Sequence, residues 1–178
     1  MRNPRRVVTG HDANGRARVA SDGEVESIEF ASGTIMTKLW GGEGPPHYPD
    51  AGTEPAYHDF FPNNGGFRFV HFSVPPDTQR EAAAVDVQDD IAFTEKHLPG
   101  IIDTFRGDKP GMHRSETIDM IYVVSGACRL ELDDAESVLV RAGDTIIQSG
   151  TMHRWRNPYD EICHLVGFLT GADWSGQD

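Results

Sequence analysis

The stretch GMHRSETIDMIYVVSG, residues 111–126, places a histidine, an aspartate and an apolar run between two glycines. The apolar run at 121–124 is rich in β-branched residues and ends at Gly126. Such a run, closed by a glycine, is typical of a β-strand that ends in a turn. The stretch therefore predicts a strand preceded by His113 and carrying Asp119, two side chains that can bind a metal ion or transfer protons.

The residues after this stretch continue in short segments of β character. Apolar and polar residues alternate over 128–133, which indicates a strand with one buried and one exposed face. A turn is expected at 133–136, and the segments SVLVRAG, DTIIQSG and ICHLVGFL each end at or near a turn residue. Several short strands at even spacing predict an all-β sandwich or small barrel.

The composition indicates one soluble domain. A length of 178 residues suits a single core, and 19 glycines with 11 prolines favour a turn-rich β protein. The formal net charge of −12 offers no basic surface for a nucleic-acid partner. No segment has the apolar length of a signal peptide or a membrane span. We expect a cytoplasmic protein without a membrane partner, in which Cys128 and Cys163 are buried thiols.

The expected single domain, residues 1–178, divides into three regions that differ in residue pattern. The first holds N-terminal strands and a long loop, the second a strand and a helical insert, and the third the core motifs. Their bounds are 1–66, 67–110 and 111–172.

Within these regions, individual elements can be placed from the residue pattern. Strands are expected at 7–9, 16–20, 34–39 and 67–74. The loop at 41–66 is long enough to be either functional or mobile. One or two short helices are expected over 78–97, with Val85, Ile91 and Phe93 as their apolar residues. This insert is expected near the mouth of the barrel.

Residues 107–126 resemble the first motif of the cupin family, which is G-x5-H-x-H-x3,4-E-x6-G. Aligning the last glycine with Gly126 puts Asp119 at the glutamate and His113 at the first histidine. Gly107 then takes the opening glycine, and Ser115 stands where the family has its second histidine.

The second cupin motif, G-x5-P-x-G-x2-H-x3-N, resembles GDTIIQSGTMHRWRN. Gly143 opens it, Gly150 takes the inner glycine, and His153 and Asn157 close it at the family's spacing. Gln148 stands where a proline is expected, and the segment before Gly150 is one residue shorter than usual.

The resemblance covers residues 107–169 well and the N-terminal third poorly. It implies a cupin double-stranded β-helix (jelly-roll barrel) with an N-terminal strand extension and a short helical insert. Cupins of this size commonly dimerise through such strands, so the resemblance also implies a homodimer. Similar cupins carry out dioxygenation, decarboxylation, isomerisation and lyase reactions, and the resemblance does not select one of them.

Two histidines and a carboxylate would suit a divalent metal. Residues two apart on a strand face the same way, so His113 and Asp119 can both point inward, with His153 brought opposite them. This set suits iron, manganese, zinc or nickel and leaves positions open for substrate. Two departures weaken the metal prediction: aspartate is one methylene shorter than glutamate, and Ser115 is a poor ligand.

The same residues also suit an enzyme without a metal. His113, His153 and Asp119 would then act as general acid or base on a small organic substrate. The residues expected to contact that substrate are Arg114, Ser115, Tyr122, Trp155 and, from the long loop, His58. Tyr122 has odd spacing from Asp119, which favours the opposite face, whereas Trp155 shares the inward side with His153.

Three functions therefore remain open. The first is a metal-dependent cupin enzyme acting on a small molecule, the second a metal-free acid–base enzyme, and the third a cupin that binds a small ligand without catalysis. The third is the weakest on organisation, because the sequence shows no DNA-binding module and its charge is acidic, but the absence of a second motif histidine is what a binding-only protein would show.

Overall fold

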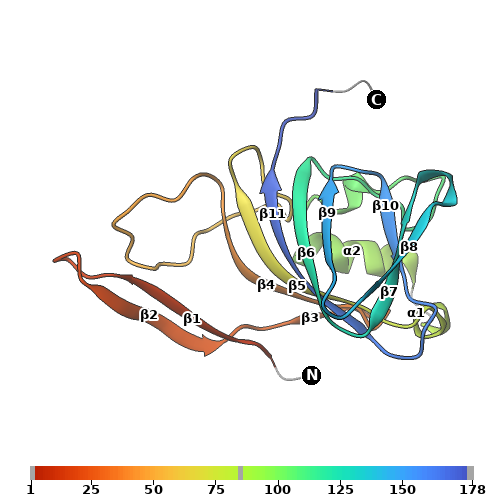
Figure 1. The fold of residues 1–178 in the computed structure, drawn as a ribbon, viewed down its shortest axis with the longest axis horizontal. Coiled ribbons are helices and arrows are strands. Elements are labelled where there is room, and N and C mark those ends of the chain that lie inside the picture. Colours follow the sequence, from red (N-terminus) through yellow and green to blue (C-terminus); the bar gives the residue numbers. More distant parts are fainter. Residues whose placement is uncertain (1–2, 84–85, 176–178) are drawn as a thin grey trace.

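The computed structural model describes residues 3–83 and 86–175, so the predicted helix residue Val85 lies outside the described residues. Strands dominate it, as the sequence predicts (Figure 1). The strands are β1 (Arg5–His11), β2 (Ala17–Glu24), β3 (Ile28–Glu29), β4 (Ile35–Gly42), β5 (Phe67–Val74), β6 (Thr117–Ser125), β7 (Ala127–Leu132), β8 (Ser137–Arg141), β9 (Thr145–Ser149), β10 (His153–Arg156) and β11 (Cys163–Gly171). The helices are α1 (Asp77–Ala82), α2 (Val87–His97), η1 (Ile102–Thr104) and η2 (Asp133–Ala135).

Two antiparallel sheets form the barrel. The larger has the strand order β3-β4-β5-β11-β6-β9, and the smaller has the order β10-β7-β8. Several neighbouring strands, such as β5 and β11 or β6 and β9, are far apart in sequence, because the chain crosses between the two sheets. This arrangement confirms the predicted all-β jelly-roll barrel.

The core lies between the two sheets and follows the predicted alternation. On β6, inward residues are buried and outward residues are exposed from Thr117 to Val124. Val123 packs there with Cys128 of β7 and with Cys163 and Leu165 of β11, all fully buried. Both cysteines are free thiols. Period-two alternation therefore fixes which side of each strand faces the barrel interior.

The helical insert is held by a helix cap and by one buried apolar residue that follows α2. The side chain of Asp86 caps α2 by accepting hydrogen bonds from the backbone N–H groups of Gln88 and Asp89. The helix itself buries no residue, but Leu98, directly after it, packs into a second apolar cluster under β4 and β5. Among the described residues, no helix is long and apolar enough to cross a membrane.

The N-terminal hairpin of β1 and β2 stands apart from the two sheets (Figure 1). It contacts the long loop at 41–66, where His11 N–H donates to the carbonyl of Asp50 at 2.6 Å. Arg6 forms an ion pair with Glu54 and lies 5.1 Å from the ring centroid of Trp40. The predicted strands at 7–9 and 16–20 lie in this hairpin.

Arg68, at the start of β5, holds the long loop against the barrel. Its side chain is 0% exposed and donates to the carbonyls of Gly42 and Asp59 and to the carboxylate of Glu43. The guanidinium also lies 3.9 Å from the ring centroid of Tyr57. A buried cation with these partners satisfies loop carbonyls that would otherwise lack donors.

We predict that Arg68→Ala lowers the free energy of unfolding by about 3 kcal/mol, because it leaves buried acceptors unpaired and opens a cavity. Urea denaturation followed by circular dichroism measures the change. Arg5→Ala is the control, since the Arg5–Asp22 ion pair is exposed and its loss should leave the midpoint unchanged. Equal effects of the two substitutions would contradict the role of Arg68.

Candidate functional site

A cavity of about 590 Å³ lies between the sheets and beneath the helical insert. Its walls include aromatic side chains and a group of buried polar side chains. The aromatic residues are Phe60, Phe61, Phe72, Phe105 and Trp155. The polar wall consists of His113, Asp119, Gln148 and His153. A largely apolar pocket with a few convergent polar groups is the usual form of a small-molecule site.

The structure brings the two motif histidines together. Their backbones form an antiparallel bridge, with N–H···O distances of 2.9 and 3.0 Å between His113 and His153. The imidazole ring centroids are 4.2 Å apart, and both rings line the cavity. The two motifs, 40 positions apart in sequence, thus meet at one point on the barrel wall.

Both histidines are uncharged at neutral pH. Burial lowers the pKa of His113, and burial together with the nearby His113 lowers the pKa of His153 to about 3. The Nδ1 atoms lie 3.1 Å from the carbonyl of Gly111 and 2.8 Å from that of Thr151, respectively. A carbonyl only accepts, so each Nδ1 carries the hydrogen and each Nε2 carries a lone pair.

Gln148 joins this pair from β9. Its side-chain amide nitrogen lies 2.8 Å from Nε2 of His153 and donates to that lone pair. The same nitrogen is 2.9 Å from Nδ1, but Nδ1 already donates to the Thr151 carbonyl. The buried Oε1 of Gln148 has no hydrogen-bond partner among the described residues. A buried acceptor without a donor is rare in folded proteins, so we expect a bound water or a bound molecule to donate to this oxygen.

Asp119 lies opposite Gln148, since the two are Cα partners between β6 and β9. It is 6% exposed, and burial raises the pKa of its carboxyl to about 6. Thr117 Oγ1 donates to Asp119 Oδ1 at 2.6 Å, and Ser115 Oγ lies 2.7 Å from Thr117 Oγ1. Ser115, at the position of the missing motif histidine, thus begins a hydroxyl chain that orients the carboxylate.

The predicted metal triad does not assemble. In the described ranges 3–83 and 86–175, no three His, Cys, Asp or Glu side chains cluster closely enough to hold a metal ion. His113 and His153 are in contact, but Asp119 is turned to Thr117 and does not complete a three-ligand group with them. The residues present therefore do not fit the predicted two-histidine, one-carboxylate centre.

Of the residues predicted to contact a substrate, those on strands line the cavity only where they lie on the inward face. Trp155 lines the cavity as expected, with its ring 6.0 Å from Phe72. Tyr122 lies on the outer face of β6, 49% exposed, as its odd spacing from Asp119 indicates. Ser115 is buried against Thr117 and does not line the cavity.

The other two predicted contacts lie away from the cavity. The guanidinium of Arg114 is 4.3 Å from the ring centroid of Trp174, in a separate surface pocket. His58 is exposed and pairs with the neighbouring Asp59 at 2.7 Å. The long loop instead contributes Phe60 and Phe61 to the cavity wall. Strand parity cannot predict such contacts, because both segments are irregular.

The sequence did not predict that Arg80, Arg156 and Gln148 line the cavity. Arg156 Nε donates to Asp77 of α1 at 2.9 Å, and Arg80 of α1 donates to the carbonyl of Trp155 at 3.1 Å. These bonds attach the helical insert to β10. The inward position of Gln148, two residues after Ile146 on one strand face, was the available signal.

Residues 106–169 match the family model of the cupin domain. The match contains both motif histidines, the whole small sheet, and strands β6, β9 and most of β11 of the large sheet. This segment of the chain is a cupin domain. The N-terminal hairpin, the long loop and β5 precede the matched segment.

Several fungal proteins are similar to this cupin. Phomopsin biosynthesis cluster protein C' of Diaporthe leptostromiformis is 43% identical over 78 residues, which cover 41% of each chain. The cupin thus aligns with about two fifths of that relative's length. The cupin-domain-containing oxidoreductase srdB of Neurospora crassa is 25% identical over 166 residues, covering 90% of this chain and 69% of its own.

Solved structures of cupins are also similar. The cupin domain of Schizosaccharomyces pombe Cnp3 has a TM-score of 0.48 at 10% identity, covering 96% of this chain and 89% of that one. A cupin 2 conserved barrel domain protein from Salinispora arenicola has a TM-score of 0.42 at 15% identity, covering 84% and 82%.

We predict that Asp119→Asn stabilises the cupin at pH 8 and leaves its stability unchanged near pH 4. The raised pKa means that the folded protein keeps a proton that the unfolded chain releases between about pH 4 and pH 6, so stability falls as pH rises through this window. The variant removes this loss, which amounts to up to about 3 kcal/mol.

Thermal melts of both proteins from pH 4 to pH 8 measure this difference. Asp108→Asn, at an exposed carboxylate, serves as the control and should show no such dependence. A wild-type protein that is more stable than Asp119→Asn at pH 8 would contradict a buried, raised-pKa carboxyl.

Proposed function

We propose that this cupin is an enzyme that moves a proton on a small, largely apolar molecule bound in the barrel. The observation that carries this proposal is the polar wall of His113, Asp119, Gln148 and His153 inside a largely apolar cavity that includes aromatic side chains. At neutral pH this wall presents imidazole lone pairs, a carboxylate and an unpaired amide oxygen. It therefore suits a ligand that brings its own O–H or N–H hydrogen.

The cavity supports a substrate class. Its volume of about 590 Å³ suits one drug-sized molecule, and its aromatic walls favour stacking on a planar ring. The unpaired Oε1 of Gln148 favours a hydroxyl or amide hydrogen on that ring system. A phenol or an enolisable ketone has both properties. Such compounds also carry a proton acidic enough for a carboxylate to remove.

Asp119 is the group best placed to accept this proton. Its carboxylate lines the cavity, and the hydroxyl chain from Ser115 through Thr117 fixes its orientation. Nε2 of His153 already accepts from Gln148, which makes it a positioning group. His113, with its free lone pair, accepts a hydrogen bond from the substrate hydroxyl.

A metal-dependent oxidoreductase is the second candidate. Several relatives carry the name oxidoreductase, and the two uncharged imidazoles in contact would supply two ligands for a divalent iron, manganese, zinc or nickel ion. This candidate needs a third ligand that the described residues do not bring to the pair. A ligand-binding cupin without catalysis is the third candidate, and it shares the cavity but not the proton transfer.

The names of the relatives place them in biosynthesis clusters, which fits a small organic substrate. We propose the cytoplasm as the compartment, since two buried free thiols persist in a reducing environment.

We predict that 2-naphthol binds more tightly than 2-methoxynaphthalene, which has the same ring but no hydroxyl hydrogen. Gln148→Leu should weaken 2-naphthol about tenfold, because it removes the unpaired acceptor, and should leave the methyl ether nearly unchanged. Isothermal titration calorimetry measures both affinities. Tyr122→Phe, on the outer face, is the matched control; equal affinities for the two probes would contradict the proposed substrate class.

We predict that the cupin catalyses exchange of the C1 hydrogens of 2-tetralone with D2O, followed by proton NMR. Asp119→Asn should lower the exchange rate by on the order of 100-fold, because general base catalysis supplies that factor, while Asp108→Asn should not. Chelator should leave the rate unchanged. Stoichiometric transition metal with loss of exchange on chelation would favour the oxidoreductase, and binding of 2-tetralone without exchange would favour the ligand-binding cupin.

A further inference from the structure

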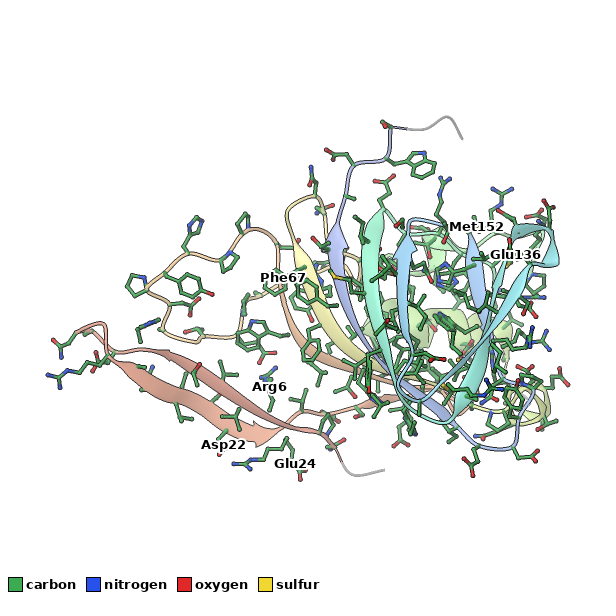
Figure 2. All side chains as sticks on the ribbon, viewed as in Figure 1. Arg6, Asp22, Glu24, Phe67, Glu136 and Met152 are labelled. Atoms are coloured by element: carbon green, nitrogen blue, oxygen red, sulfur yellow. The ribbon has the colours of Figure 1, made fainter. Side chains whose placement is uncertain are left out.

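The cavity has a second polar region, next to α1. Asp77 and Arg80 of α1 and Arg156 of β10 line the cavity there. Arg156 lies three residues after His153 on the same strand, so their α carbons are about 10 Å apart. In Figure 2 strand β10 runs from Met152, next to His153, toward the position of α1 in Figure 1. A ligand that lies along β10 would therefore meet polar groups at both of its ends.

Two arginines share one carboxylate in this region. Arg156 Nε donates to Asp77 Oδ2 at 2.9 Å, and Arg80 Nη1 lies 3.9 Å from Asp77 Oδ1. Asp77 Oδ1 also accepts from the backbone N–H of Asn157 at 3.1 Å, so both carboxylate oxygens already have a donor. One negative charge thus stands against two positive charges, and a bound anion would balance the excess.

The other acidic residues that line the cavity near α1 do not pair with these arginines. Glu81 of α1 and Asp90 of α2 line the cavity as well. Within the described residues, neither of them forms an ion pair with Arg80 or Arg156. Glu81 is exposed, so water screens its charge. The arginine N–H groups are therefore not taken up by these carboxylates.

Both arginines have hydrogen-bond donors that no described residue accepts. A guanidinium carries five N–H donors. Arg156 donates only through Nε, so its two terminal amino groups have no acceptor among residues 3–83 and 86–175. In the same part of the chain, Arg80 donates only through Nη1, to the carbonyl of Trp155 at 3.1 Å. The terminal amino groups of an arginine form a planar fork that fits a carboxylate in a bidentate pair.

The surrounding hydrogen bonds hold the two arginines in place. The backbone N–H of Asp77 donates to the carbonyl of Asn157 at 2.7 Å, which joins the start of α1 to the end of β10. The side chain of Asp77 is only 13% exposed. Because each guanidinium is already anchored by one hydrogen bond, a ligand would lose little affinity to the ordering of these side chains.

We propose that Arg156 and Arg80 bind a carboxylate of the substrate, while its hydroxyl or enolisable ketone lies at the polar wall. The inference rests on the proposed function, because it takes the cavity as the substrate site. The substrate is then an aromatic carboxylic acid with its reacting group at the far end of the ring system.

The two polar regions fix the direction in which such a substrate binds. A carboxylate finds no cation at the polar wall, because His113 and His153 are uncharged there. At the other end, Arg156 and Arg80 supply the cations. The acid group therefore lies next to α1, and the reacting proton is presented to Asp119.

Isothermal titration calorimetry with 6-hydroxy-2-naphthoate and its methyl ester at pH 7 tests the proposal. The two probes share the ring and the hydroxyl, and only the first is charged. The wild-type protein should bind the acid about tenfold more tightly than the ester, as expected for a charge-assisted pair. Arg156→Gln should remove this preference and leave the affinity for the ester unchanged, and Arg80→Gln should reduce the preference in part.

Arg129→Gln is the matched control. Arg129 is the Cα partner of Arg156 on β7, donates to Ser137 and is not among the described residues that line the cavity. This variant should bind both probes as the wild-type protein does. The circular dichroism spectrum of each variant and its affinity for 2-naphthol verify that the fold and the cavity are intact.

Equal affinities of the wild-type protein for the acid and the ester overturn the proposal. An Arg156→Gln variant that loses ester binding as much as acid binding also overturns it, since Arg156 would then act by holding α1. Failure of the proposed function looks different. In that case 2-naphthoate, which lacks the hydroxyl, binds as tightly as 6-hydroxy-2-naphthoate, while the preference for acid over ester remains.

Discussion

The backbone bridge between His113 and His153 is the contact on which the site depends. It joins the segment entering β6 of the large sheet to the first residue of β10, the edge strand of the small sheet. Because the bridge pairs these two residues directly, it brings their imidazole rings to 4.2 Å and turns both toward the cavity. The same contact closes the barrel and assembles its polar wall.

The two residues that depart from the cupin motifs, Ser115 and Gln148, both form hydrogen bonds at the site. A serine at the second histidine position cannot serve as a soft ligand, but its hydroxyl bonds to Thr117 and, through it, to Asp119. A glutamine at the proline position brings an amide to His153 and leaves an acceptor unpaired. At these two positions the chain therefore carries hydrogen-bonding side chains that can orient a substrate.

Much of the fold could be predicted because two simple signals agree. Alternation over β6 and β7 indicates which residues are buried. The glycines of the two motifs indicate where the strands end along the chain. The same parity correctly separates the outward Tyr122 from the inward Trp155. Contacts made by irregular segments could not be predicted, since neither the position of His58 nor the cation–π contact of Arg114 follows from a period.

The proposed site depends on two uncharged imidazoles whose Nδ1 atoms carry the hydrogen and whose Nε2 atoms are acceptors. Long-range ¹⁵N NMR correlation of His113 and His153 at pH 7 reads the tautomer and charge of each ring directly. We predict that both rings are neutral with the hydrogen on Nδ1. An imidazolium on either residue, a hydrogen on Nε2 of His113, or resonances shifted by a bound metal would contradict a site built from hydrogen-bond acceptors.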